Sequence, residues 1–196
     1  MKILIACEFS GTVRDAFIKK GHDAISCDLL PAESSGPHYQ GDVFNIINDD
    51  FELMVAHPPC TYLCSSGLHW NNKVHGRKKK TQDALMFVQK LLNANIRKIC
   101  LENPIGKINT AIRKPDQYIQ PHEYGHDASK RTGLWLKNLP LLKPTKYIKP
   151  RIVNGKKRWR NQTDSGQNKL PPSKDRWKLR SITYKGWAEA MAAQWG

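Results

Sequence analysis

Short apolar segments alternate along this chain with segments whose apolar residues recur at helical spacing. The apolar segments are Lys2–Cys7, Asp23–Asp28, Leu53–Ala56 and Lys98–Leu101. Helical spacing runs from Val13 to Gly21 and again over Thr81–Asn95. Strands that alternate with helices form a mostly parallel sheet with helices on both faces. We therefore predict an α/β fold with a doubly wound, mostly parallel sheet.

Composition divides the chain into three parts. Residues 1–142 contain the alternating pattern and predict one main domain, since 196 residues suffice for a single full core. Residues 143–183 predict a basic extension, because Lys146–Arg180 carries twelve Lys or Arg residues and only two acidic ones. Residues 184–196 have Trp187, Met191 and Trp195 at helical spacing and predict a C-terminal helix that docks on the core.

The net charge is strongly positive, at +15 from 32 basic and 17 acidic residues. This charge favours a polyanionic partner, because basic side chains that neutralise phosphates release counterions. No stretch approaches the roughly 18–20 apolar residues of a membrane span, so we expect no membrane partner. Five cysteines form an odd set without paired spacing, which favours a reduced, cytoplasmic setting.

Cys60 is a candidate nucleophile. It follows an apolar strand and precedes a polar loop that ends in the basic run Arg77, Lys78, Lys79 and Lys80. A cysteine just past a strand end can meet a substrate, and nearby positive charge favours its thiolate. The alternative is a small buried side chain that caps the strand, because unpaired cysteines are among the most buried residues.

Glu102 ends the apolar strand Lys98–Leu101 and precedes Asn103 and Pro104. Parallel strands end at the same edge of a sheet, so we expect Glu102 at the same edge as Cys60. Partial burial there would raise the pKa of the carboxyl group and suit it to act as a general acid. The alternative is a glutamate that caps a helix or forms a salt bridge.

Five short motifs occur in an order that resembles the DNA cytosine-C5 methyltransferase family. They are Phe9-Ser10-Gly11, Asp28, Gly41-Asp42-Val43, Pro59-Cys60 with Gly67, and Glu102-Asn103. A looser match is Tyr124-Gly125 followed by Lys130-Arg131. The resemblance covers about residues 1–140 and is greatest to small bacteriophage-borne members. It implies a Rossmann-like methyltransferase fold, S-adenosylmethionine as cofactor, DNA as partner and a bacterial host cytoplasm as location.

The resemblance also implies a role for each matched residue. Cys60 would attack C6 of cytosine, Glu102 would protonate or hydrogen-bond N3, and Arg131 would hold the O2 atom. The base must first flip out of a duplex, and the loop Thr61–Lys80 would close behind it. Glycine in the first turn would let the cofactor approach the backbone closely. The cofactor would contact residues near four strand ends: Phe9, Ser10, Gly11, Asp28, Leu29, Asp42, Val43 and Pro59.

Three features depart from the family pattern. Thr12-Val13-Arg14 replaces the further glycines that usually follow the Phe-Ser-Gly turn, and Thr61 replaces a glutamine after the cysteine. A separate target-recognition domain is missing, and only Lys143–Arg180 could stand in its place. We therefore expect a weak or short sequence preference.

Basic residues are the candidates for contacts with nucleic acid. They are Arg77, Lys78, Lys79, Lys80, Lys130, Lys156, Lys157, Arg158 and Arg160. Trp159 and Trp177 lie within the basic extension, where they either stack on exposed bases or anchor the extension to the core.

Other functions compete with this interpretation. A non-catalytic nucleic-acid-binding protein would explain the altered cofactor turn and the surplus of charge, since a fold does not guarantee its function. An amino-methyltransferase would need a carbonyl or carboxylate in place of His57 and an aromatic residue in place of Cys60. A zinc deaminase would need a ligand spacing that Cys60 and Cys64 lack, and the seven histidines have none, so we expect no metal.

Overall fold

The structure is a computed structural model that describes residues 1–196. Its main sheet has seven strands in the order β3-β2-β1-β4-β5-β7-β6. The strands are β1 (Lys2–Ala6), β2 (Asp23–Asp28), β3 (His38–Gln40), β4 (Leu53–Ala56), β5 (Lys98–Pro104), β6 (Gln117–Ile119) and β7 (Thr132–Lys137). The five strands β3, β2, β1, β4 and β5 pair in parallel in that spatial order. Strand β7 runs antiparallel to both of its neighbours, β5 and β6. This confirms the predicted α/β fold with a mostly parallel, doubly wound sheet.

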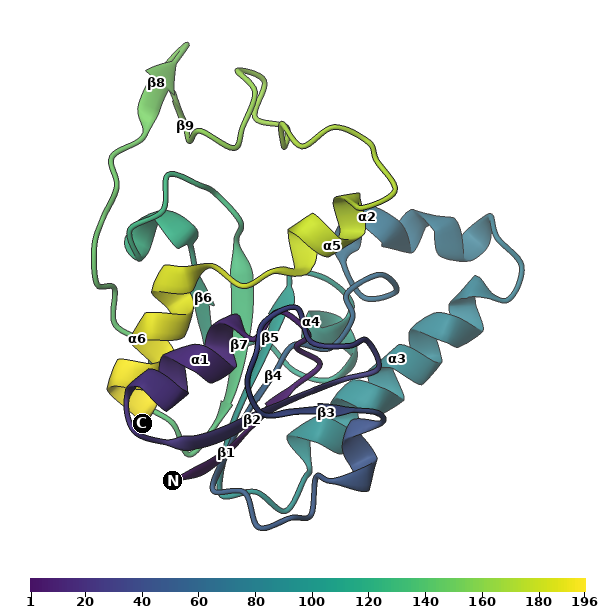
Figure 1. Ribbon diagram of the computed structural model, residues 1–196. Coiled ribbons are helices and arrows are strands. Elements are labelled where there is room, and N and C mark those ends of the chain that lie inside the picture. The colour runs from purple at the N-terminus through teal and green to yellow at the C-terminus, as the bar shows by residue number, and fades with distance from the viewer.

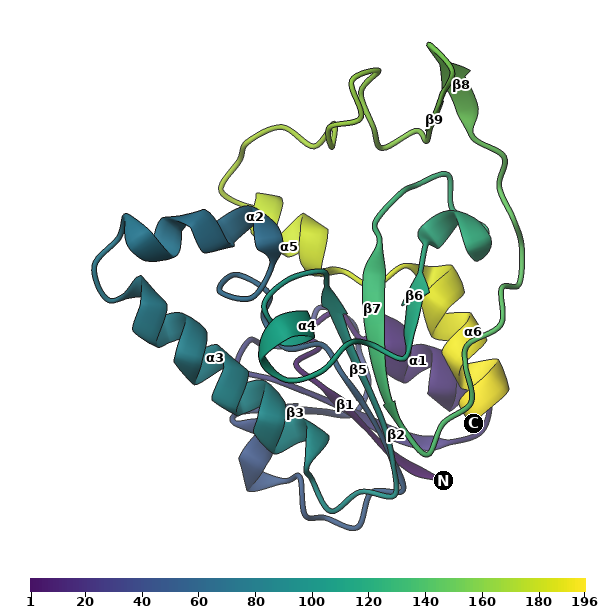
Figure 2. The ribbon, with the colours of Figure 1, turned by 180° about the vertical axis from the view of Figure 1, so that it is seen from behind.

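Helices cover both faces of the sheet (Figure 1, Figure 2). Helices α1 (Thr12–Lys19) and α6 (Lys185–Trp195) pack side by side on one face, and α3 (Arg77–Leu92) covers the other. Each face has its own apolar core, with Phe17 and Trp187 in one and Val88 in the other. The shorter helices are η1 (Val43–Asn45), α2 (Ser65–Leu68), η2 (His69–Asn72), α4 (Ile108–Ala111), η3 (Pro121–Glu123) and α5 (Arg176–Ser181). None of the helices is long and apolar enough to cross a membrane.

The strand order reverses between β1 and β4. From β1 the chain continues outward to β2 and β3 on one side, and from β4 it continues to β5 on the other. In sheets of this kind, ligands bind outside the carboxyl ends of the strands at this switch point. Ala6 is in register with both Cys27 and Ala56, so the segments that follow β1, β2 and β4 leave the sheet at one edge.

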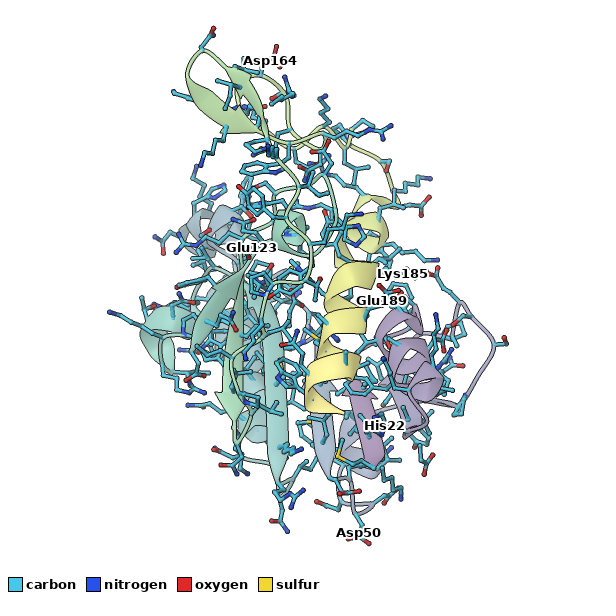
Figure 3. All side chains as sticks on the ribbon, turned by 90° about the vertical axis from the view of Figure 1, so that its left-hand side faces the viewer. His22, Asp50, Glu123, Asp164, Lys185 and Glu189 are labelled. Atoms are coloured by element: carbon cyan, nitrogen blue, oxygen red, sulfur yellow. The ribbon has the colours of Figure 1, made fainter.

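The basic extension forms a two-stranded hairpin that projects beyond this carboxyl edge (Figure 1). Strands β8 (Arg151–Val153) and β9 (Lys156–Arg158) are joined by Asn154 and Gly155, whose φ angles are 49° and 72°. Two consecutive residues with positive φ make the tight turn that matches the twist of a hairpin. Figure 3 shows Asp164 at this outer end of the molecule, with His22 and Asp50 near the opposite end.

Trp159 joins the extension to the main domain. Its ring stacks on that of His122, with centroids 4.0 Å apart and planes inclined by 16°, and its side chain is buried. A buried, stacked indole cannot also stack on a nucleic-acid base, so Trp159 is an anchor. Trp177 differs, since it is 58% exposed on α5.

The segment after Cys60 is more helical than predicted. Instead of a loop over Thr61–Lys80, it contains α2, η2 and the first turn of α3, which begins at Arg77 rather than near Thr81. The N-cap is Gly76, with a φ of 73° and no capping side chain. The sequence conceals this start, because a helix N-terminus favours acidic residues and this first turn carries basic ones.

Candidate active site

Cys60 lies at the carboxyl edge of the sheet, in the loop that follows β4. Its side chain is partly exposed, whereas Cys27 and Cys100 are buried within strands. The loop is fixed on both sides of the cysteine. The Asn103 amide donates a 2.7 Å hydrogen bond to the carbonyl oxygen of Pro58, and the Cys64 N–H donates one of 2.9 Å to that of Cys60. Cys60 is therefore held on a fixed turn and is not a buried cap of the strand.

The thiols of Cys60 and Cys64 are hydrogen-bonded to each other. This contact and burial raise the pKa of Cys60, and Lys130 opposes them. The hydrogen bond from Cys60 lowers the pKa of Cys64 to about 5, against the effect of burial, and the Ser66 hydroxyl and the Gly67 N–H add to this lowering. The interaction thus favours a thiolate on Cys64 over one on Cys60. This differs from the expectation that the basic run stabilises a thiolate on Cys60.

Glu102 lies near the end of β5, beside the end of β4. The register of the two strands pairs Ala56 with Leu101, so the next position along each strand brings His57 beside Glu102. Nδ1 of His57 is 3.1 Å from Oε2 of Glu102, and both side chains are 8% exposed. Oε1 of Glu102 and Nε2 of His57 are buried without a hydrogen-bond partner. Buried polar atoms normally have partners, so these two are unusual in having none.

The pKa of Glu102 is lowered, contrary to the expectation from the sequence. Burial acts to raise it, but the Lys130 ammonium, His57 and the Thr132 hydroxyl outweigh burial. The expectation counted burial and not these partners, two of which come from the distant start of β7. At neutral pH Glu102 is therefore a carboxylate, and it needs a proton donor before it can act as an acid.

Lys130, and not Arg131, faces the two catalytic candidates. The Lys130 charge acts on both Cys60 and Glu102. The Arg131 guanidinium instead lies 4.2 Å from the ring centre of Tyr118 on β6. Successive side chains of an extended chain point to opposite sides, so Lys130 shares the side of Thr132, which reaches Glu102. The predicted roles are thus exchanged in position: Lys130 adjoins the site and Arg131 packs away from it.

The Phe9-Ser10-Gly11 turn connects β1 to α1. Gly11 has a φ of 74°, and a Cβ atom there would collide with Ser34 Oγ and with the Arg14 guanidinium. Glycine is therefore required by the chain's own packing, and not by the approach of a ligand as the resemblance implies. Arg14 is fully buried and donates hydrogen bonds to Ser34 Oγ at 2.7 Å and to the Ser35 carbonyl at 2.8 Å. Arg14 thereby ties the loop after β2 to the segment that follows the Phe9-Ser10-Gly11 turn.

The other predicted cofactor residues divide between the rim and the core. Asp28 is half-buried, which raises its pKa, and its Oδ1 accepts a 3.0 Å hydrogen bond from the Leu30 N–H. Leu29, Asp42 and Pro59 are exposed on the same edge. Val43 differs, because its side chain is buried in the core beneath α3, so that only its backbone can meet a ligand.

Helix α5 connects the Phe9-Ser10-Gly11 turn with the side of the site that holds Lys130. The Trp177 ring packs against Phe9 with centroids 6.4 Å apart, and Lys178 forms an ion pair with Glu33 in the loop after β2. At the other end of the helix, Nζ of Lys130 donates a 3.3 Å hydrogen bond to the carbonyl oxygen of Arg180. The basic extension is thereby connected to both halves of the site.

Comparison with known proteins finds a likeness of fold rather than of sequence. No protein-family model and no curated protein matches the chain. The crystal structure of a Spodoptera frugiperda DNMT2 mutant aligns with 80% of this chain at 15% sequence identity and a TM-score of 0.45. The alignment spans 57% of the DNMT2 chain. At this identity the likeness concerns the fold alone.

The basic residues predicted to contact nucleic acid fall into two groups. One group is the first turn of α3, with Arg77, Lys78, Lys79 and Lys80, and the other is β9 and its end, with Lys156, Lys157, Arg158 and Arg160. Three of the eight have internal partners. The Arg77 guanidinium donates to the Thr61 carbonyl at 3.0 Å, that of Arg158 donates to the Asp164 carbonyl at 2.9 Å, and Lys79 forms a 3.6 Å ion pair with Asp83. All of the eight except Arg77 and Arg158 are exposed.

Sequence reasoning missed three partners of the site. The sequence uses His57 only to argue against an amino-methyltransferase and Cys64 only to argue against a zinc deaminase. It predicts Lys130 as a contact to nucleic acid. A signal existed for His57, because it follows β4 directly and Glu102 occupies the same position past Leu101 on the neighbouring strand. No comparable signal existed for Cys64 or Lys130, whose positions depend on a turn and on side-chain direction.

Proposed function

We propose that this protein is an S-adenosylmethionine-dependent methyltransferase that acts on C5 of cytosine in DNA, with Cys60 as nucleophile. The observation that carries the proposal is the placement of Cys60 just after β4 and of Glu102 near the end of the adjacent β5, tied together by the 2.7 Å hydrogen bond from Asn103 to Pro58. The Lys130 charge acts on both groups. A nucleophile beside an acid and a cation suits a reaction in which a thiolate adds to a base ring and is later eliminated from it.

The proposed reaction uses these groups in sequence. The Cys60 thiol loses its proton to water and its sulfur forms a bond to C6, while the electrons of the C5–C6 double bond move toward N3, which gains a proton from the side of Glu102. Lys130 stabilises the thiolate before attack and the carboxylate after proton donation. Bound S-adenosylmethionine would supply the methyl group that C5 then takes. Loss of the C5 proton to water and expulsion of the thiolate restore the aromatic ring and the enzyme.

The residues at the edge fit such a cofactor in part. Asp28 accepts only one hydrogen bond, at Oδ1, and its half-buried carboxylate would suit the hydroxyls of a ribose. Trp177, which packs against the buried Phe9 ring of the first βα turn, presents exposed aromatic surface. Gly11 contributes less than in the resembling family, since Ser34 and Arg14 fill the space in front of it.

Duplex DNA is the proposed substrate because exposed basic residues lie on two elements beside the site. Lys156 and Lys157 lie on the projecting hairpin, and Lys78 and Lys80 lie on α3. Contacts to phosphates from both elements would hold the duplex while one base leaves the stack, at a cost of a few kcal/mol.

The proposal is tested by trapping the covalent intermediate. DNA that contains 5-fluorocytosine has no C5 proton to lose, so an enzyme of this kind remains attached after methyl transfer. We expect a denaturant-resistant adduct that depends on S-adenosylmethionine and maps to Cys60 by mass spectrometry. The Cys60→Ser variant should form none, whereas Cys64→Ser, which removes the neighbouring thiol, should retain it. Failure of the native protein to form the adduct would refute the proposed function.

A second candidate function is a non-catalytic nucleic-acid-binding protein with this fold. It is favoured by one observation, the filling of the space at Gly11 by Ser34 and Arg14. Titration calorimetry separates the two functions. DNA binding without any heat from S-adenosylmethionine would support the binding protein.

A further inference from the structure

The imidazole of His57 is a buried titratable group for which the resembling family offers no role. Its Nδ1 is 3.1 Å from Oε2 of Glu102, and its Nε2 is buried with no partner. The other titratable groups nearby are Lys130, whose charge acts on Glu102, the Cys60 thiol in the same loop, and Cys7, which follows β1 beside the end of β4. Among these groups, His57 is the one in hydrogen-bond contact with the acid that can both give and regain a proton near neutral pH.

We propose that His57 is the proton store of the site, which lends a proton to Glu102 for transfer to N3 of the target cytosine and takes it back at the end of the cycle. This inference rests on the proposed function. It answers a difficulty that the structure raises, since Lys130, Thr132 and His57 itself keep Glu102 ionised, and a carboxylate has no proton to donate. His57 acts through Glu102, so it is a positioning residue and not a group that touches the base.

The proton balance of the step is closed. As the C6–sulfur bond forms, the Nδ1–H bond of an imidazolium breaks and an O–H bond forms on Oε2 of Glu102. The terminal torsion of a glutamate is two-fold and soft, so a half-turn of the carboxyl group presents the proton to N3. Expulsion of Cys60 releases the N3 proton, which returns through Glu102 to Nδ1. No proton is consumed, and none must come from solvent.

The burial of the His57–Glu102 pair agrees with reversible proton transfer between the two side chains. A lone carboxylate is costly to bury, but an imidazolium–carboxylate pair carries no net charge. Because Nε2 of His57 has no partner and is shielded from solvent, the stored proton is kept within the site rather than exchanged. An unpartnered buried nitrogen would be a defect in a purely structural histidine.

The first test reads the pair without any turnover. In the full-length protein at neutral pH, nitrogen-15 NMR of the imidazole rings reports whether Nδ1 of His57 carries a proton, with and without Glu102→Gln. We expect a protonated Nδ1 in the native protein and a change of the His57 nitrogen-15 resonances in the variant, because an opposite charge within about 4 Å favours the charged imidazole. The resonances of His22, at the other end of the molecule, should not move (Figure 3). A native His57 without a proton on Nδ1 would overturn the inference.

The second test measures the rate of adduct formation with 5-fluorocytosine DNA across pH. The native rate should fall at high pH, where the site no longer holds a proton for N3. His57→Gln keeps a hydrogen-bond donor but cannot titrate, so it should lower the neutral-pH rate by about a hundredfold and move that limb toward acid. His57→Asn is the replacement if the glutamine variant does not fold, and His22→Gln is the control. An adduct whose pH profile is unchanged by His57→Gln overturns this inference alone, whereas no adduct with the native protein overturns the proposed function as well.

Discussion

The side-chain amide of Asn103 donates a hydrogen bond of 2.7 Å to the carbonyl oxygen of Pro58 and so ties the end of β5 to the loop that carries Cys60. Asn103 is buried, and its amide oxygen has no partner. The residue next to Glu102 therefore fixes the chain two positions before Cys60. This single contact couples the end of β5 to the loop that follows β4.

Replacing Asn103 by Ala should lower stability and loosen the nucleophile loop. Loss of the donor leaves the buried Pro58 carbonyl unpaired, which costs about 1–3 kcal/mol in the free energy of unfolding. Urea denaturation measures this cost, and adduct formation should slow more than tenfold because small displacements of a nucleophile are costly. Asn109→Ala serves as the control, because it removes a hydrogen bond of the same length, 2.7 Å, that the Asn109 amide donates to the Tyr118 hydroxyl at an exposed position.

Lys130→Met should impair the site, and Arg131→Met should not. Without the Lys130 charge, the pKa of Cys60 and that of Glu102 both rise, since Lys130 lowers each of them. A higher pKa leaves less Cys60 thiolate at a given pH, so alkylation of Cys60 in the free protein should slow several-fold. Arg131 packs on Tyr118, and its loss should leave that rate within about twofold. Equal effects of the two variants would contradict the assignment.

Cys64 should be the more reactive thiol of the pair. Its pKa is lowered to about 5, whereas that of Cys60 is raised, so at about pH 6 most of the thiolate belongs to Cys64. Limited treatment with iodoacetamide, followed by peptide mapping, should modify Cys64 first. The Cys64→Ala variant removes the hydrogen bond and charge that raise the pKa of Cys60, so Cys60 should then be labelled faster than in the native protein.

The sheet and its carboxyl edge follow from features that the sequence states locally. Apolar runs end at Cys7, Asp28, Ala56 and Leu101, and parallel strands bring such ends together whatever side chains they carry. This was enough to predict that Cys60 and Glu102 lie at one edge. The location of Cys60 and Glu102 at this edge does not depend on any long-range side-chain contact.

The remaining features of the site depend on contacts between distant segments. Lys130 differs from Arg131 only in which side of the chain it faces, and a shift by one position exchanges the two. The glycine at position 11 is explained by Ser34 and Arg14, and no local pattern announces that a loop will fold back onto it. Helix α3 begins with basic residues, which a helix N-terminus disfavours, so the sequence predicts a loop where its first turn lies.

Trp159→Ala should detach the extension from the main domain. The indole is buried and stacked on His122, and removal of a buried tryptophan costs about 3 kcal/mol or more. Limited proteolysis should then cut the chain within residues 143–175, while the main domain remains intact. Trp177→Ala is the matched control, because that side chain is 58% exposed and its loss should leave the protease pattern unchanged.

Neutralising the hairpin should flatten the salt dependence of DNA binding. Lys156 and Lys157 are exposed and free of internal partners, whereas Arg158 holds the Asp164 carbonyl. If both lysines contact phosphates of a duplex, Lys156→Gln with Lys157→Gln should reduce the slope of log K against log salt by about 1.8. Fluorescence anisotropy over a range of salt concentrations measures this slope. The same substitutions at Lys19 and Lys20, exposed at the end of α1, should leave it unchanged, and an equal reduction there would mean that only net charge, and not the hairpin, attracts the DNA.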